Sequence, residues 1–245
     1  MNAPLDPNGP IYLDYNATTP VDPRVAEAAD AALREAWGNP SSAHPYGARA
    51  LDRLEGARRQ LAELLGAGPD EIVFTGGGSE SDNLAIKGIV FAARGRGNHV
   101  VTSAVEHPAV LATCRWIVDR LGGRLTLLPV DGTGRVDPGD VAGAIEPSTV
   151  LVTVMHANNE VGTLNPIAEI ARVCRERGVV FHTDAAQSVG KVPIRVDDRV
   201  PGAGYPHPSF GRVPDPAAGY PAGTGASRVP GAGCPLAGGA GRGGV

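Results

Sequence analysis

The 245-residue sequence is short of lysine, cysteine and aromatic residues, and it has no long apolar run. Three widely spaced cysteines, Cys114, Cys174 and Cys234, do not form the even set that a disulfide framework needs. No apolar run approaches the ~20 residues of a membrane-spanning helix. The first ten residues contain neither the basic nor the apolar region of a signal peptide. We therefore expect a cytoplasmic protein with no membrane partner.

Excess positive charge is also lacking. The formal net charge is −4, which gives no reason to expect a nucleic-acid partner. The hydrophobic content of 42% is enough to build a core in a chain of this length. That apolar content is unevenly distributed, because residues 199–245 hold 13 of the 34 glycines and 8 of the 22 prolines and show no apolar periodicity. We expect an ordered part over 1–198 and a disordered tail over 199–245.

Short apolar runs alternate with helical patterns over most of the first part. The runs that predict strands are 71–75, 99–104, 124–130, 149–156 and 179–185. The intervening patterns predict helices at 79–95, 108–122, 137–147 and 166–178, and two earlier helices are expected at roughly 23–37 and 46–65. Continuously apolar strands separated by helices indicate an α/β fold with a mainly parallel sheet covered by helices.

Polar sequences follow four of the predicted strands. They read "TGGGSES", "EHP", "HANNE" and "TDAAQS" in chain order. Ligands of open α/β sheets bind at the carboxyl ends of the strands, where such loops meet. The repetition of polar loops at one edge of the sheet predicts a functional site there.

The first of these loops is a glycine-rich turn that opens a helix. Backbone N–H groups and the helix dipole at such a turn favour an anion, and the Ser79 hydroxyl adds a donor. The turn matches neither the dinucleotide pattern nor the phosphate-binding P-loop. The alternative is a simple strand-to-helix turn in which Ser79 is the N-cap.

Asp184 comes directly after a predicted buried strand, where a carboxylate needs a partner. A ligand cation such as a protonated pyridine nitrogen would serve, and a structural salt bridge or a helix cap is the alternative. His107, His156 and His182 raise the possibility of a metal site with Asp184. No His-x-x-x-His or Cys-x-x-Cys spacing supports it, so we expect no metal.

Six stretches together resemble one enzyme family. They are "IYLDYNATTPVDPRV", "GNPSSAHPYG", "FTGGGSESDNLAIKG", "VEHPAVL", "MHANNEVGT" and "HTDAAQSVGK". In this order and spacing they are similar to the cysteine desulfurases of iron–sulfur cluster assembly. These are pyridoxal-phosphate enzymes of the class V aminotransferase group with the type I fold. The resemblance covers residues 11–198 and implies that 1–198 is a cofactor-binding large-domain portion with an N-terminal segment.

The resemblance implies roles for residues that hold the phosphate and the ring. Gly78 and Ser79 match the phosphate-binding pair at the helix N-terminus. His107 matches the catalytic histidine that stacks on the pyridine ring and assists proton transfer. Asp184 matches the carboxylate that keeps the pyridine nitrogen protonated, which makes the cofactor a better electron sink.

Further matches lie at the cofactor's phenolic oxygen and on the substrate side. Asn159 and Gln187 match the pair near that oxygen, and Asn16 and Asn39 lie in family motifs near the substrate. The family converts L-cysteine to L-alanine and leaves the sulfur on a protein cysteine. It works as a homodimer and passes the sulfur to an acceptor scaffold protein, so these partners are implied here.

The family reaction also needs a lysine that anchors the cofactor and a nucleophilic cysteine. In the family the lysine follows a Ser-x-His-Lys pattern beyond the aspartate and glutamine motif, where this sequence reads "VDDRVPGAGYPHPSFGR". The only two lysines, Lys87 and Lys191, match non-catalytic family lysines. We therefore expect the C-terminal small domain to be absent and the chain to be inactive.

The abrupt change near Arg199 has two explanations. The first is a frameshift in a GC-rich reading frame, and the second is a genuine alternative C-terminus. Two functional alternatives also stay open. The chain could be a non-catalytic fragment or pseudoenzyme, or it could descend from another class V enzyme such as a selenocysteine lyase or a transaminase of small amino acids.

Overall fold

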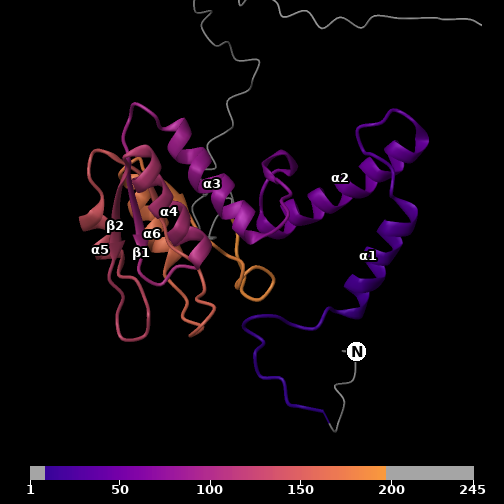
Figure 1. Ribbon diagram of the computed structural model, residues 1–245, viewed down its shortest axis with the longest axis horizontal. Coiled ribbons are helices and arrows are strands. Elements are labelled where there is room, and N and C mark those ends of the chain that lie inside the picture. The colour runs from indigo at the N-terminus through magenta and orange to yellow at the C-terminus, as the bar shows by residue number, and fades with distance from the viewer. Residues whose placement is uncertain (1–8, 197–245) are drawn as a thin grey trace, which may run out of the picture. The chain divides into compact units, whose positions relative to one another are not determined.

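The computed structural model describes residues 9–196 (Figure 1). The glycine- and proline-rich segment predicted to be disordered, 199–245, lies outside the described residues. The helices within 9–196 include none with the length and apolar character needed to cross a membrane.

Four elements precede the sheet in the chain. They are α1 (Pro23–Glu35), α2 (Pro45–Leu65), the 3₁₀ turn η1 (Pro69–Glu71) and α3 (Gly78–Ala92). Helix α1 starts where the side chain of Asp22 accepts a hydrogen bond from the N–H of Arg24, with proline in the first turn. Helix α2 ends at Gly66, whose φ of 70° is left-handed and suits glycine.

The sheet is parallel throughout, as the sequence predicts. Its strands are β1 (His99–Ser103), β2 (Arg124–Leu128), β3 (Thr149–Thr153) and β4 (Val180–His182), in the spatial order β2-β1-β3-β4. The connecting helices are α4 (Pro108–Leu121), α5 (Pro138–Ala144) and α6 (Ile167–Glu176). Parallel strands need such crossovers, which explains the regular alternation in the sequence.

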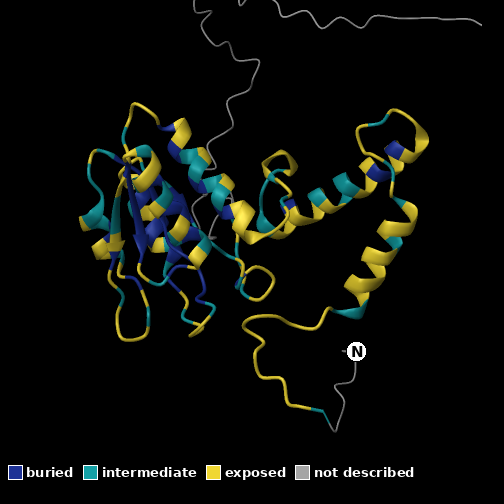
Figure 2. Cartoon of the chain, viewed as in Figure 1, coloured by how far each residue is buried: buried dark blue, intermediate teal, exposed yellow. Residues whose placement is uncertain are grey.

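Alternate residues of the central strands feed two hydrophobic clusters. Val101 and Val152 pack in a cluster with residues of α5 and α6. Val100 and Leu151 belong to a second cluster with residues of α3 and α4. Successive side chains of a strand point to opposite faces, so the two clusters lie on opposite faces of the sheet. Figure 2 shows the buried residues concentrated in the strands and in the helix faces turned toward them.

The strand predicted at 71–75 does not form. Residues 72–75 follow η1 without strand pairing, and Val73 and Phe74 are 68% and 42% exposed. A strand needs a neighbour for its backbone N–H and C=O groups, and none of the four described strands pairs with this segment. The Arg58 side chain donates a hydrogen bond to the carbonyl of Ile72 and lies over the Phe74 ring, 4.9 Å from its centroid.

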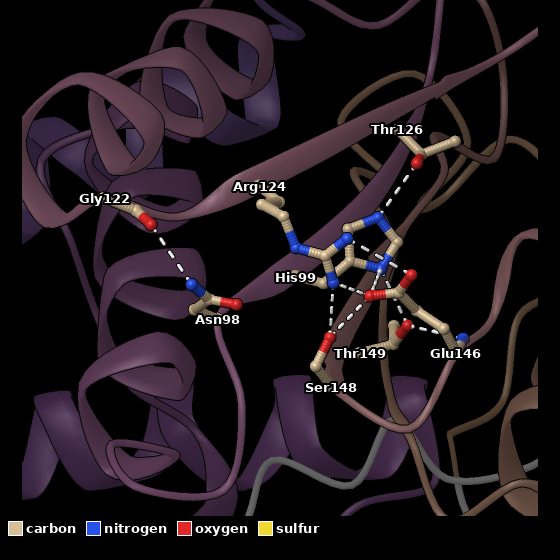
Figure 3. Close-up of polar contacts among 8 residues, drawn as sticks. All are labelled: Asn98, His99, Gly122, Arg124, Thr126, Glu146, Ser148 and Thr149. Atoms are coloured by element: carbon tan, nitrogen blue, oxygen red, sulfur yellow. Dashed lines mark hydrogen bonds and ion pairs between the residues drawn. The ribbon is translucent and has the colours of Figure 1, made fainter.

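A polar cluster holds the amino ends of three strands together (Figure 3). The imidazole of His99 in β1 lies 2.8 Å from Thr149 Oγ1 in β3 and 2.9 Å from Thr126 Oγ1 in β2. Arg124 pairs with Glu146 beside it. His99, Arg124 and Thr149 are the first residues of their strands, so this cluster lies at the edge opposite the carboxyl ends.

Candidate functional site

Three of the four predicted polar loops meet at the carboxyl edge of the sheet. His107 follows β1, Asn159 follows β3, and Asp184 and Gln187 follow β4. The strands are parallel and adjacent in the order β1-β3-β4, so the loops after them leave the same edge. The remaining loop, the glycine-rich turn before α3, does not follow a strand. Helix α3 itself packs against α4 and β3.

The loop after β1 is fixed by Glu106. Its Oε1 atom accepts hydrogen bonds from Ser103 Oγ at 2.5 Å and from the N–H of Met155 at 2.9 Å, which ties β1 to the end of β3. Its Oε2 atom is buried without a hydrogen-bond partner among the described residues. Burial raises the pKa of Glu106 to about 7, although the two hydrogen bonds lower it.

His107 caps helix α4. Its Nδ1 atom accepts a hydrogen bond from the N–H of Ala109 at 3.1 Å. A ring nitrogen that accepts carries no proton, so a neutral His107 has its proton on Nε2. That Nε2–H is the group His107 can offer to a ligand.

The two asparagines after β3 have different roles. Asn158 is buried, with its Nδ2 donating to the Val105 carbonyl at 3.1 Å and its Oδ1 accepting from the N–H of Glu160 at 2.8 Å. It therefore shapes the loop, a role that the sequence alone did not suggest. Asn159 is half-buried, and within residues 9–196 its side chain hydrogen-bonds only to its neighbour Glu160, which leaves further amide groups for a ligand.

The turn after β4 presents Asp184 and Gln187. Asp184 is half-buried, and its Oδ1 accepts from the N–H of Ala186 at 2.9 Å. Gln187 Nε2 donates to the carbonyl of Asn16 at 3.4 Å, and its Oε1 accepts from Lys191 Nζ at 3.0 Å. The carbonyl of Asn16 thus contacts the turn, whereas Asn39 uses its side chain to accept from the N–H of Ser41.

Asp82 on α3 joins this site, although the sequence analysis missed it. Ligand atoms of Asp82, His107 and Asp184 all lie within 4.8 Å of one another. Asp82 is 5% exposed, and desolvation raises its pKa to about 7, with the charge of Asp184 adding to the shift. Its spacing was the available signal, because Asp82 lies four residues before buried Ile86 and eight before buried Val90 on one helix face.

The cluster has more acid than base. Asp82, Glu106 and Asp184 form no ion pair with a lysine or arginine of residues 9–196. The arrangement therefore suits a bound cation. The absence of a metal from this site stays a prediction from the sequence.

The glycine-rich turn already holds an anionic group of the protein itself. Helix α3 begins after Gly77, so Ser79 is not the N-cap that one interpretation of the sequence suggested, and it is exposed. Glu80 Oε2 accepts from the N–H of Gly76 at 2.6 Å. Around Gly77 and Gly78 a Cβ would meet nothing within 4 Å, so the turn is open. An exposed turn whose backbone binds a carboxylate fits a phosphate.

The two described cysteines are unsuited to nucleophilic attack. Cys114 and Cys174 are fully buried within α4 and α6, and desolvation raises the pKa of each thiol to about 12. Lys87 Nζ lies 4.5 Å from the centroid of the Trp116 ring, and Lys191 is bonded to Gln187. Both lysines are thus engaged by groups of the protein.

Comparison with known proteins identifies the family. The model of the class V aminotransferases matches residues 11–199. The cysteine desulfurase IscS of Dictyoglomus turgidum is 48% identical over 188 residues, which cover 77% of this chain and 48% of that protein. IscS of Pseudomonas aeruginosa is 52% identical over 191 residues, or 77% of this chain and 47% of that protein.

Solved structures agree. SspA in complex with cysteine has a TM-score of 0.73 at 44% identity, covering 76% of this chain and 54% of that one. A NifS-like protein has a TM-score of 0.73 at 37% identity, covering 77% and 52%. The chain spans about half the length of the curated relatives it matches. With a family match over residues 11–199 on a parallel α/β sheet, the chain belongs to the class V aminotransferases.

Proposed function

We propose that residues 9–196 form the pyridoxal-phosphate site of a cysteine desulfurase. The observation that carries this proposal is the cluster of Asp82, His107 and Asp184 at the carboxyl edge of the sheet. An excess of acid at that position calls for a cationic ring, and the open glycine-rich turn suits a phosphate. The relatives named as cysteine desulfurases support the same choice.

The phosphate would bind at the turn before α3. The N–H groups that begin the helix, at Gly78 and Ser79, and the exposed Ser79 hydroxyl are the donors we assign to it. The Gly76 N–H that Glu80 now occupies is a further donor. The positive end of the helix dipole adds to the attraction for a dianion.

The ring would lie between His107 and Asp184. Asp184 is the acceptor for a protonated pyridine nitrogen, and such a charge-assisted hydrogen bond is stronger than a neutral one. His107 would stack on the ring and move a proton through Nε2, since Nδ1 is used by the cap of α4. When bound, the cofactor supplies an electron sink for carbanion chemistry on an amino acid.

The other side of the ring would face two amides. Among the described residues the Asn159 side chain hydrogen-bonds only to Glu160. The Gln187 amide donates to the Asn16 carbonyl and accepts from Lys191. We assign both to the phenolic oxygen, where a donor N–H is needed. Asn16 and Asn39 stay predictions on the substrate side.

The substrate and partners follow from the same resemblance. SspA is known in complex with cysteine, and we propose L-cysteine as the substrate for which this site evolved. We further propose a homodimer and a sulfur-acceptor scaffold protein of iron–sulfur cluster assembly as partners, in the cytoplasm.

We propose that the 245-residue chain binds the cofactor without turning over cysteine. The two lysines are held by Trp116 and Gln187, and Cys114 and Cys174 are buried as neutral thiols. The site therefore has ring and phosphate ligands but, among residues 9–196, no lysine in the family's Ser-x-His-Lys pattern and no accessible thiolate for the covalent steps.

Binding of 4′-deoxypyridoxine 5′-phosphate tests the site. This probe carries the ring nitrogen and the phosphate but no aldehyde, so it reports non-covalent recognition alone. We expect Asp184→Asn to weaken binding by about 10- to 100-fold, the value of a hydrogen bond to a charged group.

The exposed Asp119 provides a matched control for that change in charge. It lies 12 residues beyond His107 on α4, or ~18 Å along the helix. Asp119→Asn should bind the probe like the wild type. Equal affinities in the wild type and Asp184→Asn would contradict the proposed site.

A further inference from the structure

In the group of Asp82, His107 and Asp184, Asp82 is the residue for which the family resemblance implied no role. It comes from α3, whereas Asp184 follows β4 and His107 follows β1. Within the described part of the chain its carboxyl forms no side-chain hydrogen bond, and His182 Nε2 lies 3.8 Å from its Oδ1. That separation is too long for a hydrogen bond. A carboxyl so buried and so poorly partnered calls for an explanation.

We propose that Asp82 is a positioning residue for Asp184: it is a neutral acid while the site is empty, and it gives up its proton when a protonated pyridine ring pairs with Asp184. This inference rests on the proposed cofactor site and adds a proton-coupled residue beneath it.

Asp82 faces titratable groups from every element that packs on it. His182 comes from β4, His107 and Glu106 come from the loop after β1, and Asp184 comes from the loop after β4. Cys114 on α4 adds a buried thiol near Glu106. The set holds acids and bases, so the charge that each carries near neutral pH decides the field at Asp82.

The buried His182 and, beyond it, His156 supply no positive charge. Burial lowers the pKa of His182 to about 4 and lowers the pKa of His156, so both rings are neutral near pH 7. His182 is also fixed by Thr153, whose Oγ1 lies 2.8 Å from its Nδ1. The contact between Asp82 and His182 is therefore not an ion pair.

Two charged carboxylates at this separation repel each other, and a cation beside them relieves the repulsion. Atoms of Asp82 and Asp184 lie within 4.8 Å of one another, and Asp184 is the more exposed of the two, with an N–H donor from Ala186. Asp184 therefore carries the negative charge and Asp82 the proton. A ring cation against Asp184 removes the repulsion between the two, so Asp82 can ionise and add a second charge that holds the ring.

The test compares the wild type and Asp82→Asn with two probes between pH 5.5 and 8.5. One probe is 4′-deoxypyridoxine 5′-phosphate, and the other is benzyl phosphate, which has a phosphate and a ring but no ring nitrogen. Titrations of the probes cancel in the ratio of affinities of the two proteins. For the nitrogen-containing probe we expect the affinity of the wild type divided by that of Asp82→Asn to rise from about 1 at pH 5.5 to about 10 at pH 8.5. A tenfold rise corresponds to a decrease of one unit in the pKa of Asp82 on binding. For benzyl phosphate we expect the same ratio of affinities at every pH.

A measurement on the wild type alone guards against a misfolded variant. Carboxyl ¹³C NMR with labelled aspartate should show one buried carboxyl that titrates near pH 7 in the free protein. With the nitrogen-containing probe bound, the same carboxyl should titrate at least one unit lower. Asp119→Asn is the control for the loss of one charge, and its affinity ratio to the wild type should not change with pH.

The outcomes separate the two proposals. A wild type that binds the nitrogen-containing probe no better than benzyl phosphate overturns both the ring site and the role of Asp82. A second outcome overturns only the role of Asp82. In it the wild type prefers the nitrogen-containing probe, but the affinity ratio to Asp82→Asn does not change with pH or the pKa of the buried carboxyl does not fall on binding.

Discussion

The carboxylate of Glu80 lies on the backbone of the glycine-rich turn, with Oε2 2.6 Å from the N–H of Gly76. Glu80 lies in the first turn of α3, whose N-terminus we assign to the phosphate, so its carboxylate competes with a ligand anion for one donor. The competition involves only the start of α3 and the turn before it, because Gly76 and Glu80 both lie there.

Glu80→Gln should therefore bind benzyl phosphate more tightly than the wild type. Removing the negative charge near the phosphate and weakening its hold on the Gly76 N–H should raise affinity about 3- to 10-fold, the size of one helix-terminus charge effect. Calorimetry at low ionic strength measures it, and the gain should shrink with added salt. Weaker binding by the variant would mean that Glu80 supports the turn instead of competing for it.

Much of the architecture could be predicted because its signals are local. Continuously apolar runs such as 149–156 mark buried parallel strands, and the polar residues directly after them mark the carboxyl edge. The segment 71–75 also contains an apolar run, yet it is unpaired, because pairing depends on strands distant in sequence. The sequence analysis did not identify Asp82 as a site residue for a related reason. Only the packing of α3 shows that the helix face carrying Asp82 is turned inward.

Reduction with borohydride in the presence of pyridoxal phosphate should fix no stoichiometric adduct. Lys191 Nζ donates to Gln187 Oε1 at 3.0 Å, and Lys87 Nζ lies over the Trp116 ring. Mass spectrometry of the intact chain should show the same background labelling in the wild type and in Lys191→Arg. A one-to-one adduct that disappears in Lys191→Arg would show that Lys191 takes the place of the anchoring lysine.

His99 should make the native state sensitive to mild acid. Burial and the charge of Arg124 lower the pKa of this imidazole, so the folded protein binds its proton less readily than the unfolded chain. Stability from this group is present above the ordinary histidine pKa of 6.5 and is lost as the pH falls below it.

A His99→Gln variant isolates that contribution. At pH 7.5 it should be less stable by about 1–2 kcal/mol, because it loses hydrogen-bond geometry to Thr126 and Thr149 (Figure 3). The gap should narrow at pH 5.5, where the wild type alone pays the cost of keeping His99 neutral. Urea unfolding at the two pH values measures both differences, and parallel losses in the two proteins would contradict the assignment.

Helix α1 should make the chain associate with itself. None of its residues is buried, and Val25 and Leu33, eight residues apart on one face, are 59% and 77% exposed. Trp37, just beyond the helix, is 69% exposed. Exposed large apolar side chains on one helix favour association with another protein surface. Light scattering of the 245-residue chain should show an average mass that rises with concentration.

Leu33→Lys tests whether α1 is the source of that association. A charge in the middle of the apolar face should lower the average mass at a given concentration, whereas Glu27→Lys on the same helix is a control that leaves Val25, Leu33 and Trp37 in place. Far-ultraviolet circular dichroism should be unchanged in both variants, because a lysine on an exposed helix face is a good helix former. A wild type that stays monomeric at all concentrations, or a Leu33→Lys protein that associates as before, would place the exposed apolar face of α1 outside any self-association.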